Sequence, residues 1–179
     1  MRQGHTLIEL VITILIIAIM AAGAFISIES YKSLRLDAAA KRMASDLDYA
    51  RNLALSTAKW YRVDFAVEPN NMYQVYNTTG LVENPVDNPI EDPSSGNNFV
   101  VNLNDSYNGV KIVALSLGVG LPDIPTDVYF NPLGVPYANY GDPILPVGDN
   151  GQIVLQYGDD EEMQKTVLIT PNTGRISIE

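Results

Sequence analysis

The N-terminal stretch MRQGHTLIEL, residues 1–10, decides the fold of this chain, and apolar and small residues continue from it to Ile28. Between Glu9 and Glu29 lie 19 residues without a charge, which as a helix span roughly 28 Å of hydrocarbon. A carboxylate costs about 2.5–3.5 kcal/mol at the middle of a bilayer and less near its surface. We therefore expect Glu9 to have a partner.

Two simple interpretations account for part of this pattern. In a secretory signal peptide, Arg2 would form a short basic region and Ala22-Gly23-Ala24 would be a cleavage site. Against this, Glu9 would fall inside the apolar core of the signal, where a charge weakens recognition. An ordinary single-pass membrane anchor explains the length of the run but gives Glu9 no role.

The segment Gly4-His5-Thr6-Leu7-Ile8-Glu9 resembles the processing and assembly signal of type IV pilins and type II secretion pseudopilins, in which Gly-Phe-Thr-Leu-Ile-Glu is usual. The resemblance implies cleavage by prepilin peptidase between Gly4 and His5, and N-methylation of His5. It also implies that Glu9 sets the register of assembly by pairing with the N-terminal amine of a neighbouring subunit. The sequence departs from the usual pattern at His5, where phenylalanine is common.

Charge and composition exclude several classes of function. From Asp64 to Glu179 there are three basic residues against sixteen acidic ones, a net charge of −13. Such a surface disfavours nucleic acid, because affinity for a polyanion depends on Lys and Arg. The chain has no cysteine, and its single histidine is His5, so a His- or Cys-based catalytic site or a zinc site is not expected in the domain. We expect no enzyme activity, no cofactor and no bound metal.

Proline and glycine divide the chain into a helix and a β-rich domain. All eleven prolines lie at or beyond Pro69, and Gly23 is the only glycine between His5 and Thr79. The pattern predicts one helix over residues 6–59, followed by strands. The expected divisions are a leader over 1–4, a transmembrane and assembly half of the helix over 5–29, an amphipathic half over 30–59, and a globular periplasmic domain over 60–179.

The second half of this helix is amphipathic. Its predicted apolar stripe consists of Leu36, Ala40, Met43, Leu47, Ala50 and Ala54, at alternating steps of four and three. The opposite face is expected to carry Asp37, Lys41, Arg42, Asp46, Asp48 and Arg51. Asp37–Lys41 and Arg42–Asp46 have the i,i+4 spacing of helical ion pairs. The stripe therefore predicts a helix that packs on a sheet.

Short alternating runs predict the strands of the domain. They cover residues 60–67, 72–76, 99–103, 110–115, 128–130, 152–157, 166–170 and 175–178. The first two runs form a predicted hairpin, and residues 152–157 and 166–170 form another. Residues 79–98 contain three prolines and several acids and are predicted to be a loop.

Three further segments resemble one particular family, that of the minor pseudopilin H and FimT-like minor pilins (GspH/FimT). They are the helix run 35–54, Phe130-Asn131-Pro132-Leu133-Gly134, and residues 167–176, which read VLITPNTGRI. The resemblance, including the N-terminus, covers roughly half the chain. It implies an α+β, type IV pilin-like fold, with a long N-terminal helix, transmembrane in its first half, packed on an antiparallel β-sandwich-like domain.

The family resemblance implies a structural subunit of a periplasm-spanning filament, anchored in the bacterial inner membrane by one span. Its partners would be other pilins or pseudopilins, prepilin peptidase and the inner-membrane assembly platform. The leading hypothesis is a minor pseudopilin of a type II secretion system, and the alternative is a minor pilin of a type IV pilus. A DNA-uptake receptor is disfavoured, because Gly174-Arg175-Ile176-Ser177 lacks the second arginine of the Gly-Arg-x-Arg motif.

Two acidic turns contain oxygen ligands of the kind that bind calcium. Asp149-Asn150-Gly151 and residues 159–162 supply oxygen atoms, but neither has the spacing of an EF-hand loop. Solvated turns explain both segments, so we expect no metal site there.

Overall fold

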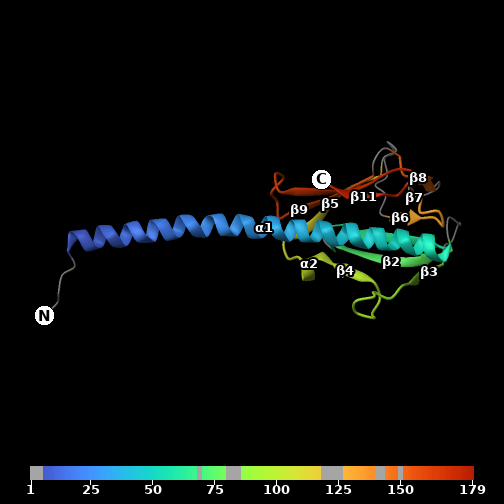
Figure 1. The fold of residues 1–179 in the computed structure, drawn as a ribbon, viewed down its shortest axis with the longest axis horizontal. Helices are drawn as coiled ribbons and strands as arrows, with labels where there is room; N and C mark the ends of the chain where they lie inside the picture. The colour runs from blue at the N-terminus through green and yellow to red at the C-terminus, as the bar shows by residue number, and fades with distance from the viewer. Residues whose placement is uncertain (1–5, 68–69, 80–85, 118–126, 140–143, 149–150) are drawn as a thin grey trace. The chain divides into compact units, whose positions relative to one another are not determined.

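The computed structural model describes residues 6–67, 70–79, 86–117, 127–139, 144–148 and 151–179. It divides into two compact units, Met1–Leu34 and Arg35–Glu179. The first unit contains the N-terminal half of helix α1, and the second contains its C-terminal half together with all the described strands (Figure 1).

Helix α1 spans Leu7–Thr57, which confirms the predicted helix to within two residues at each end. Ala58 follows it with a positive φ of 52°, and a left-handed residue at this place ends a helix. The predicted apolar stripe is confirmed: its six side chains are at most 3% exposed. Ala39, which was not predicted, joins the stripe and is fully buried.

The strands form two antiparallel sheets, as the resemblance implied. The larger sheet contains β1 (Trp60–Ala66), β2 (Met72–Thr78), β3 (Asp87–Pro89), β4 (Val100–Asn102), β6 (Asp127–Phe130), β7 (Pro136–Asn139) and β8 (Ile144–Pro146). Its order is β3-β2-β1-β6-β7-β8, and β4 also pairs with β2. The smaller sheet contains β5 (Val110–Ser116), β9 (Gly151–Tyr157), β10 (Gln164–Ile169) and β11 (Ile176–Ile178), in the order β11-β10-β9-β5.

Both predicted hairpins are confirmed, as β1–β2 and β9–β10, but other parts of the prediction were wrong. The predicted loop over 79–98 contains β3, and Glu91 and Asn98 form a bridge within it. Short helix α2, Leu103–Ser106, begins where a strand was expected to end. Strands β7 and β8 were missed. Each of these strands has three or four residues and includes a proline, which in a sequence resembles a loop.

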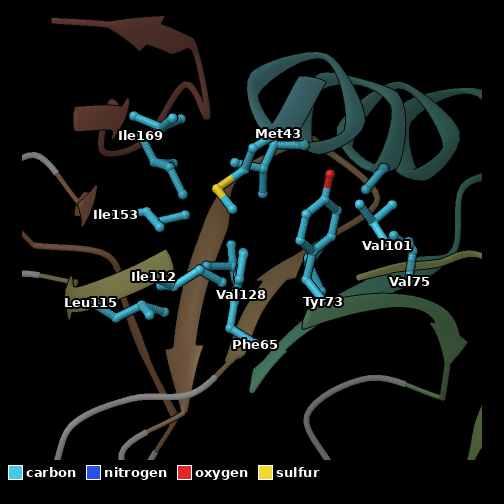
Figure 2. Packing of buried hydrophobic residues seen from close by; sticks show 14 of the residues in the cluster. Met43, Phe65, Tyr73, Val75, Val101, Ile112, Leu115, Val128, Ile153 and Ile169 are labelled. Atoms are coloured by element: carbon cyan, nitrogen blue, oxygen red, sulfur yellow. The ribbon is translucent and has the colours of Figure 1, made fainter. Parts of the chain in front are cut away.

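Helix α1 packs on both sheets in the second unit. In Figure 1, β2 and β4 of the larger sheet lie along one side of this half of the helix, and the smaller sheet lies along the other. Figure 2 shows Met43 directed into the space between Tyr73 of the larger sheet and Ile153 and Ile169 of the smaller one. All four side chains are at most 1% exposed, so the stripe closes a single core.

Asn71 connects the two sheets by hydrogen bonds. It has a positive φ of 48° and is 5% exposed, and Asn is among the residues that tolerate this conformation. Its side-chain Oδ1 accepts from the backbone N–H of Ile112 at 3.1 Å. Its backbone carbonyl accepts from Leu103 at 2.9 Å. The turn before β2 is thereby fixed to β5 and to the start of α2.

A three-way junction lies near the end of α1. Arg51 Nε donates to the carbonyl of Thr173 at 2.9 Å. Gly174 has a φ of +64°, and a Cβ on it would lie 2.3 Å from the carbonyl oxygen of Gly134. Two turns, one after β6 and one before β11, therefore meet against the helix with no room for a side chain. These turns belong to two of the segments that carried the family resemblance.

This junction predicts that Gly174→Ala destabilises the fold much more than Gly158→Ala. Both glycines have a positive φ, but a Cβ on Gly158 meets nothing within 4 Å. The left-handed conformation alone should cost Gly158→Ala about 1–2 kcal/mol. The clash should add about 1–3 kcal/mol for Gly174→Ala. Chemical unfolding of both variants in detergent measures the difference, and equal losses would contradict a packed junction.

Candidate functional site

The first turn of α1 holds the candidate assembly residue Glu9. The backbone N–H of Glu9 lies 3.1 Å from the carbonyl oxygen of Thr6 and 3.4 Å from Thr6 Oγ1. Thr6 thus occupies the N-cap position and Glu9 the third position of the helix, the residue types and spacing of a capping box. A carboxylate in the first turn also complements the helix dipole. Gly4 and His5 lie outside the described residues.

The helix that follows is apolar on every side. The exposed large apolar side chains in its first four turns are Leu7, Ile8, Leu10, Val11, Ile12, Ile14, Leu15, Ile16, Ile17, Ile19 and Met20, at 49–82%. Thr13 donates its hydroxyl hydrogen to the carbonyl of Leu10 at 2.8 Å, so this polar side chain is satisfied within the helix. A helix that is apolar all round requires apolar surroundings.

Within the described part of the chain, no helix is both long enough and apolar enough to cross a membrane.

A buried polar cluster attaches α1 to the larger sheet. Asp46 was expected on the charged face opposite the apolar stripe, yet it is buried, at 6% exposed. The phenol of Tyr73 donates to Asp46 Oδ2 at 2.6 Å, and Arg42 Nε donates to the same oxygen at 2.8 Å. Burial is the main reason that the pKa of Asp46 is raised, and burial beside this carboxylate raises the pKa of Tyr73. The i,i+4 spacing predicted the Arg42 pair, but nothing in the sequence placed Tyr73 beneath it.

Cavities near this cluster are small. Two of them, of about 200 Å³ each, flank Arg42 and share Asp92 and Ser94 in their walls. Among the residues that the structure describes, no three His, Cys, Asp or Glu side chains are arranged to hold a metal ion. Asp159 forms an ion pair with Lys111 at 2.8 Å, and the other acidic turn, Asp149-Asn150, lies outside the described residues.

A second charged cluster lies on the face of the larger sheet opposite α1. Arg62 pairs with Asp127 at 3.3 Å, with Asp64 at 3.5 Å and with Asp87. Burial, followed by a hydrogen bond with Asp64, raises the pKa of Asp127 to about 6. Side chains alternate between the two faces of a strand, so the sequence of β1 predicts only that Arg62 and Asp64 share a face. Asp87 and Asp127 reach them through sheet pairing, which local sequence does not encode.

We predict that Asp127→Asn stabilises the protein near neutral pH. Because the pKa of Asp127 rises from 3.8 to about 6 on folding, its contribution to stability is complete below pH 3.8 and is lost as the pH rises through 6. As the pH rises from 3.8 to above 6, the free energy of unfolding of the variant should come to exceed that of the native chain by up to about 3 kcal/mol. Unfolding by urea at several pH values measures this. Asp159→Asn, at a side chain that is 99% exposed, is the control, and equal pH dependence in both variants would contradict the cause.

Comparisons with known proteins agree with this geometry. The model of the prokaryotic N-terminal methylation motif matches residues 1–25. A comparison with curated proteins finds no match. The minor pseudopilin EpsH of the type 2 secretion system of Vibrio cholerae has a similar structure, with a TM-score of 0.54 and 11% identity over 81% of this chain and 96% of that one. The type IV minor pilin FimU of Pseudomonas aeruginosa has a TM-score of 0.52 and 13% identity, over 80% of this chain and 87% of that one.

The fold defines a type IV pilin-like protein: a long N-terminal helix followed by antiparallel sheets. The N-terminal motif is of the prepilin type. The described domain has the fold of EpsH and FimU, and the methylation motif precedes it in the chain.

Proposed function

We propose that this chain is a minor pseudopilin, a structural subunit of the pseudopilus of a type II secretion system, with no chemistry of its own. The observation that carries the proposal is that two features occur together in one chain. A methylation motif occupies residues 1–25, and the remainder folds like EpsH. The exposed apolar helix between Leu7 and Met20 adds support, because such a surface needs lipid or other apolar helices around it.

The proposed assembly begins at the N-terminus. Prepilin peptidase cleaves between Gly4 and His5, and the new amine of His5 is methylated. The apolar half of α1 anchors the chain in the inner membrane, with the acidic domain in the periplasm. On extraction by the assembly platform, the carboxylate of Glu9 pairs with the amine of a neighbouring subunit. In apolar surroundings an unpaired charge is the costly species, so this pair favours one axial register.

A minor pilin of a type IV pilus is the second candidate. The similarity to FimU, with a TM-score of 0.52 against 0.54 for EpsH, favours it almost equally. Both candidates use the same N-terminal chemistry. A photo-crosslinker at Ile16, on the exposed face of α1, separates them: capture of other pseudopilins supports the proposal, and capture of a major pilin replaces it with the alternative.

DNA uptake is not proposed. Arg175 is exposed, but it is one of three basic residues beyond Val63, against sixteen acidic ones. Affinity for DNA depends on phosphate neutralisation by several basic groups. Tight binding of duplex DNA by the full chain at physiological salt would overturn this conclusion.

Loss of the Glu9 carboxylate should prevent assembly without preventing processing. We predict that Glu9→Gln reduces the amount of the chain in sheared filaments at least tenfold, because the amide has no charge to pair with an amine. The mass of the mature N-terminus should remain that of the cleaved, methylated chain. Glu29→Gln makes the same chemical change at the other end of the uncharged run and should assemble normally. Equal loss in both variants would argue against a specific role for Glu9.

A further inference from the structure

The charged cluster around Arg62 plays no part in the proposed function. Arg62 lies on β1 and pairs with three carboxylates: Asp64 on the same strand, Asp127 on β6 and Asp87 on β3. One positive group therefore faces three negative ones, and the three carboxylates compete for a single guanidinium. The charge on any one of them affects how firmly Arg62 holds the others.

The surroundings of this cluster strengthen the competition. Tyr76 and Tyr129 lie opposite Arg62 on the neighbouring strands, and their ring centroids are 5.7 and 5.9 Å from its central carbon. Asp127 is 4% exposed, and charges interact more strongly where water is excluded. Among the described residues, the titratable groups around Asp127 are Arg62 and Asp64 of β1, Tyr76 of β2, Asp87 of β3 and Tyr129 of β6 itself.

A proton shared between two carboxyl groups sets the charge of the cluster. Asp64 and Asp127 are direct partners on β1 and β6, and burial, followed by their hydrogen bond, raises the pKa of Asp127 to about 6. Such a bond needs a proton on one of the two, because an ionised carboxylate can only accept. Below this pH, Arg62 balances the one remaining charge, and Asp87 meets three groups with no net charge. Above it, the same three groups have a net charge of −1 and repel Asp87.

Strand β3 is the part of the sheet that this repulsion can move. It has three residues and lies at the edge of the larger sheet beside β2 (Figure 1). Asn88 and Pro89 are exposed, and Pro89 has no N–H to donate to β2. Directly after the strand, the N–H of Ile90 donates to the carbonyl of Val75 at 3.3 Å. An opening would therefore be confined to residues 86–89.

The closed position of β3 also leaves polar atoms unsatisfied. Thr78, the residue opposite Asp87, is 4% exposed. In the described part of the chain, Thr78 Oγ1, Asp87 Oδ1 and Arg62 Nε are buried without a hydrogen-bond partner. Buried polar atoms without a partner destabilise the state that contains them, and separation of β3 from β2 would let water reach Thr78 and Asp87. The ion pair between Arg62 and Asp87 opposes this separation.

We propose that the Arg62 cluster is a proton-dependent latch that holds strand β3 on the edge of β2. While Asp64 and Asp127 share a proton, Arg62 holds Asp87 and the strand stays closed. When the proton is lost to solvent, Arg62 is drawn to the two ionised carboxylates, Asp87 is released and residues 86–89 separate from β2. Because the raised pKa of Asp127 belongs to the closed state, closure is favoured at low pH and is weakened as the pH rises through about 6. The latch belongs to the domain alone and does not depend on which filament the chain joins.

Hydrogen exchange of the full chain in detergent, followed by mass spectrometry below and above pH 6 and corrected for the intrinsic pH dependence of exchange, tests the latch. Protection of residues 86–89 should fall at least tenfold at the higher pH, while that of the hairpin β9–β10 stays constant. Asp127→Asn is neutral at both pH values, like the protonated acid, and should keep β3 protected at both. Asp159→Asn, at an exposed side chain, is the matched control and should behave like the native chain.

Three results would overturn the latch: constant protection of residues 86–89 in the native chain, equal loss in Asp127→Asn, or a loss that extends to β9–β10 and so reflects unfolding of the whole domain. If Asp127→Asn does not fold, Asp64→Asn makes the same change in the other carboxyl group of the pair and should give the same result. Asp87→Asn removes the latch itself, so residues 86–89 should exchange rapidly at both pH values. Protection retained in this variant would show that Arg62 does not hold the strand.

Discussion

Burial of one stripe of α1 against two sheets is the interaction on which the rest of the domain depends. Four of the seven residues in the stripe are alanines, at positions 39, 40, 50 and 54, and all are fully buried. Small side chains let the helix backbone approach the strands closely, while Met43 and Leu47 fill the space between the sheets. Full burial of such a large apolar side chain contributes about 1.5–3 kcal/mol. Since the chain has no cysteine, this packing must hold the sheets without a disulfide.

Polar contacts determine the rotation and axial position of the helix on the sheets more than they determine how strongly the helix packs there. An apolar stripe of small residues can slide or turn on a sheet with little loss of buried area. The bond between Tyr73 and Asp46 and the bond from Arg51 to Thr173 exist in one position only. A buried carboxylate adds little net stability after its desolvation is counted. Its value here is that a misplaced helix would lose the bond from Tyr73 and leave Asp46 with only Arg42 of its own helix as a partner.

The sequence predicted the features that periodicity encodes: the helix, its stripe and the two hairpins. It failed where position depends on contacts distant along the chain. Residues 87–89 form strand β3 because they pair with β2, although their own sequence is typical of a loop. Asp46 lies at a predicted polar position, yet its carboxylate is buried and accepts a hydrogen bond from Tyr73, 27 residues away. Glu9 was recognisable from the sequence because its cost in an apolar run is local, whereas the partner proposed for it belongs to another chain.

The first turn of α1 lowers the cost of placing a carboxylate at the start of an apolar helix. The backbone N–H of Glu9 donates to Thr6 Oγ1, which is one of the two bonds of a capping box, and a carboxylate at a helix N-terminus gains about 0.3–1 kcal/mol from the helix dipole. Glu9 is therefore partly compensated before any neighbour arrives. In the proposed assembly, a pair between two chains replaces this weak local interaction, and the driving force is the difference in free energy between the two. Under this proposal, the local compensation lowers the free-energy cost of an unassembled subunit in a bilayer, and the charge still favours a single register.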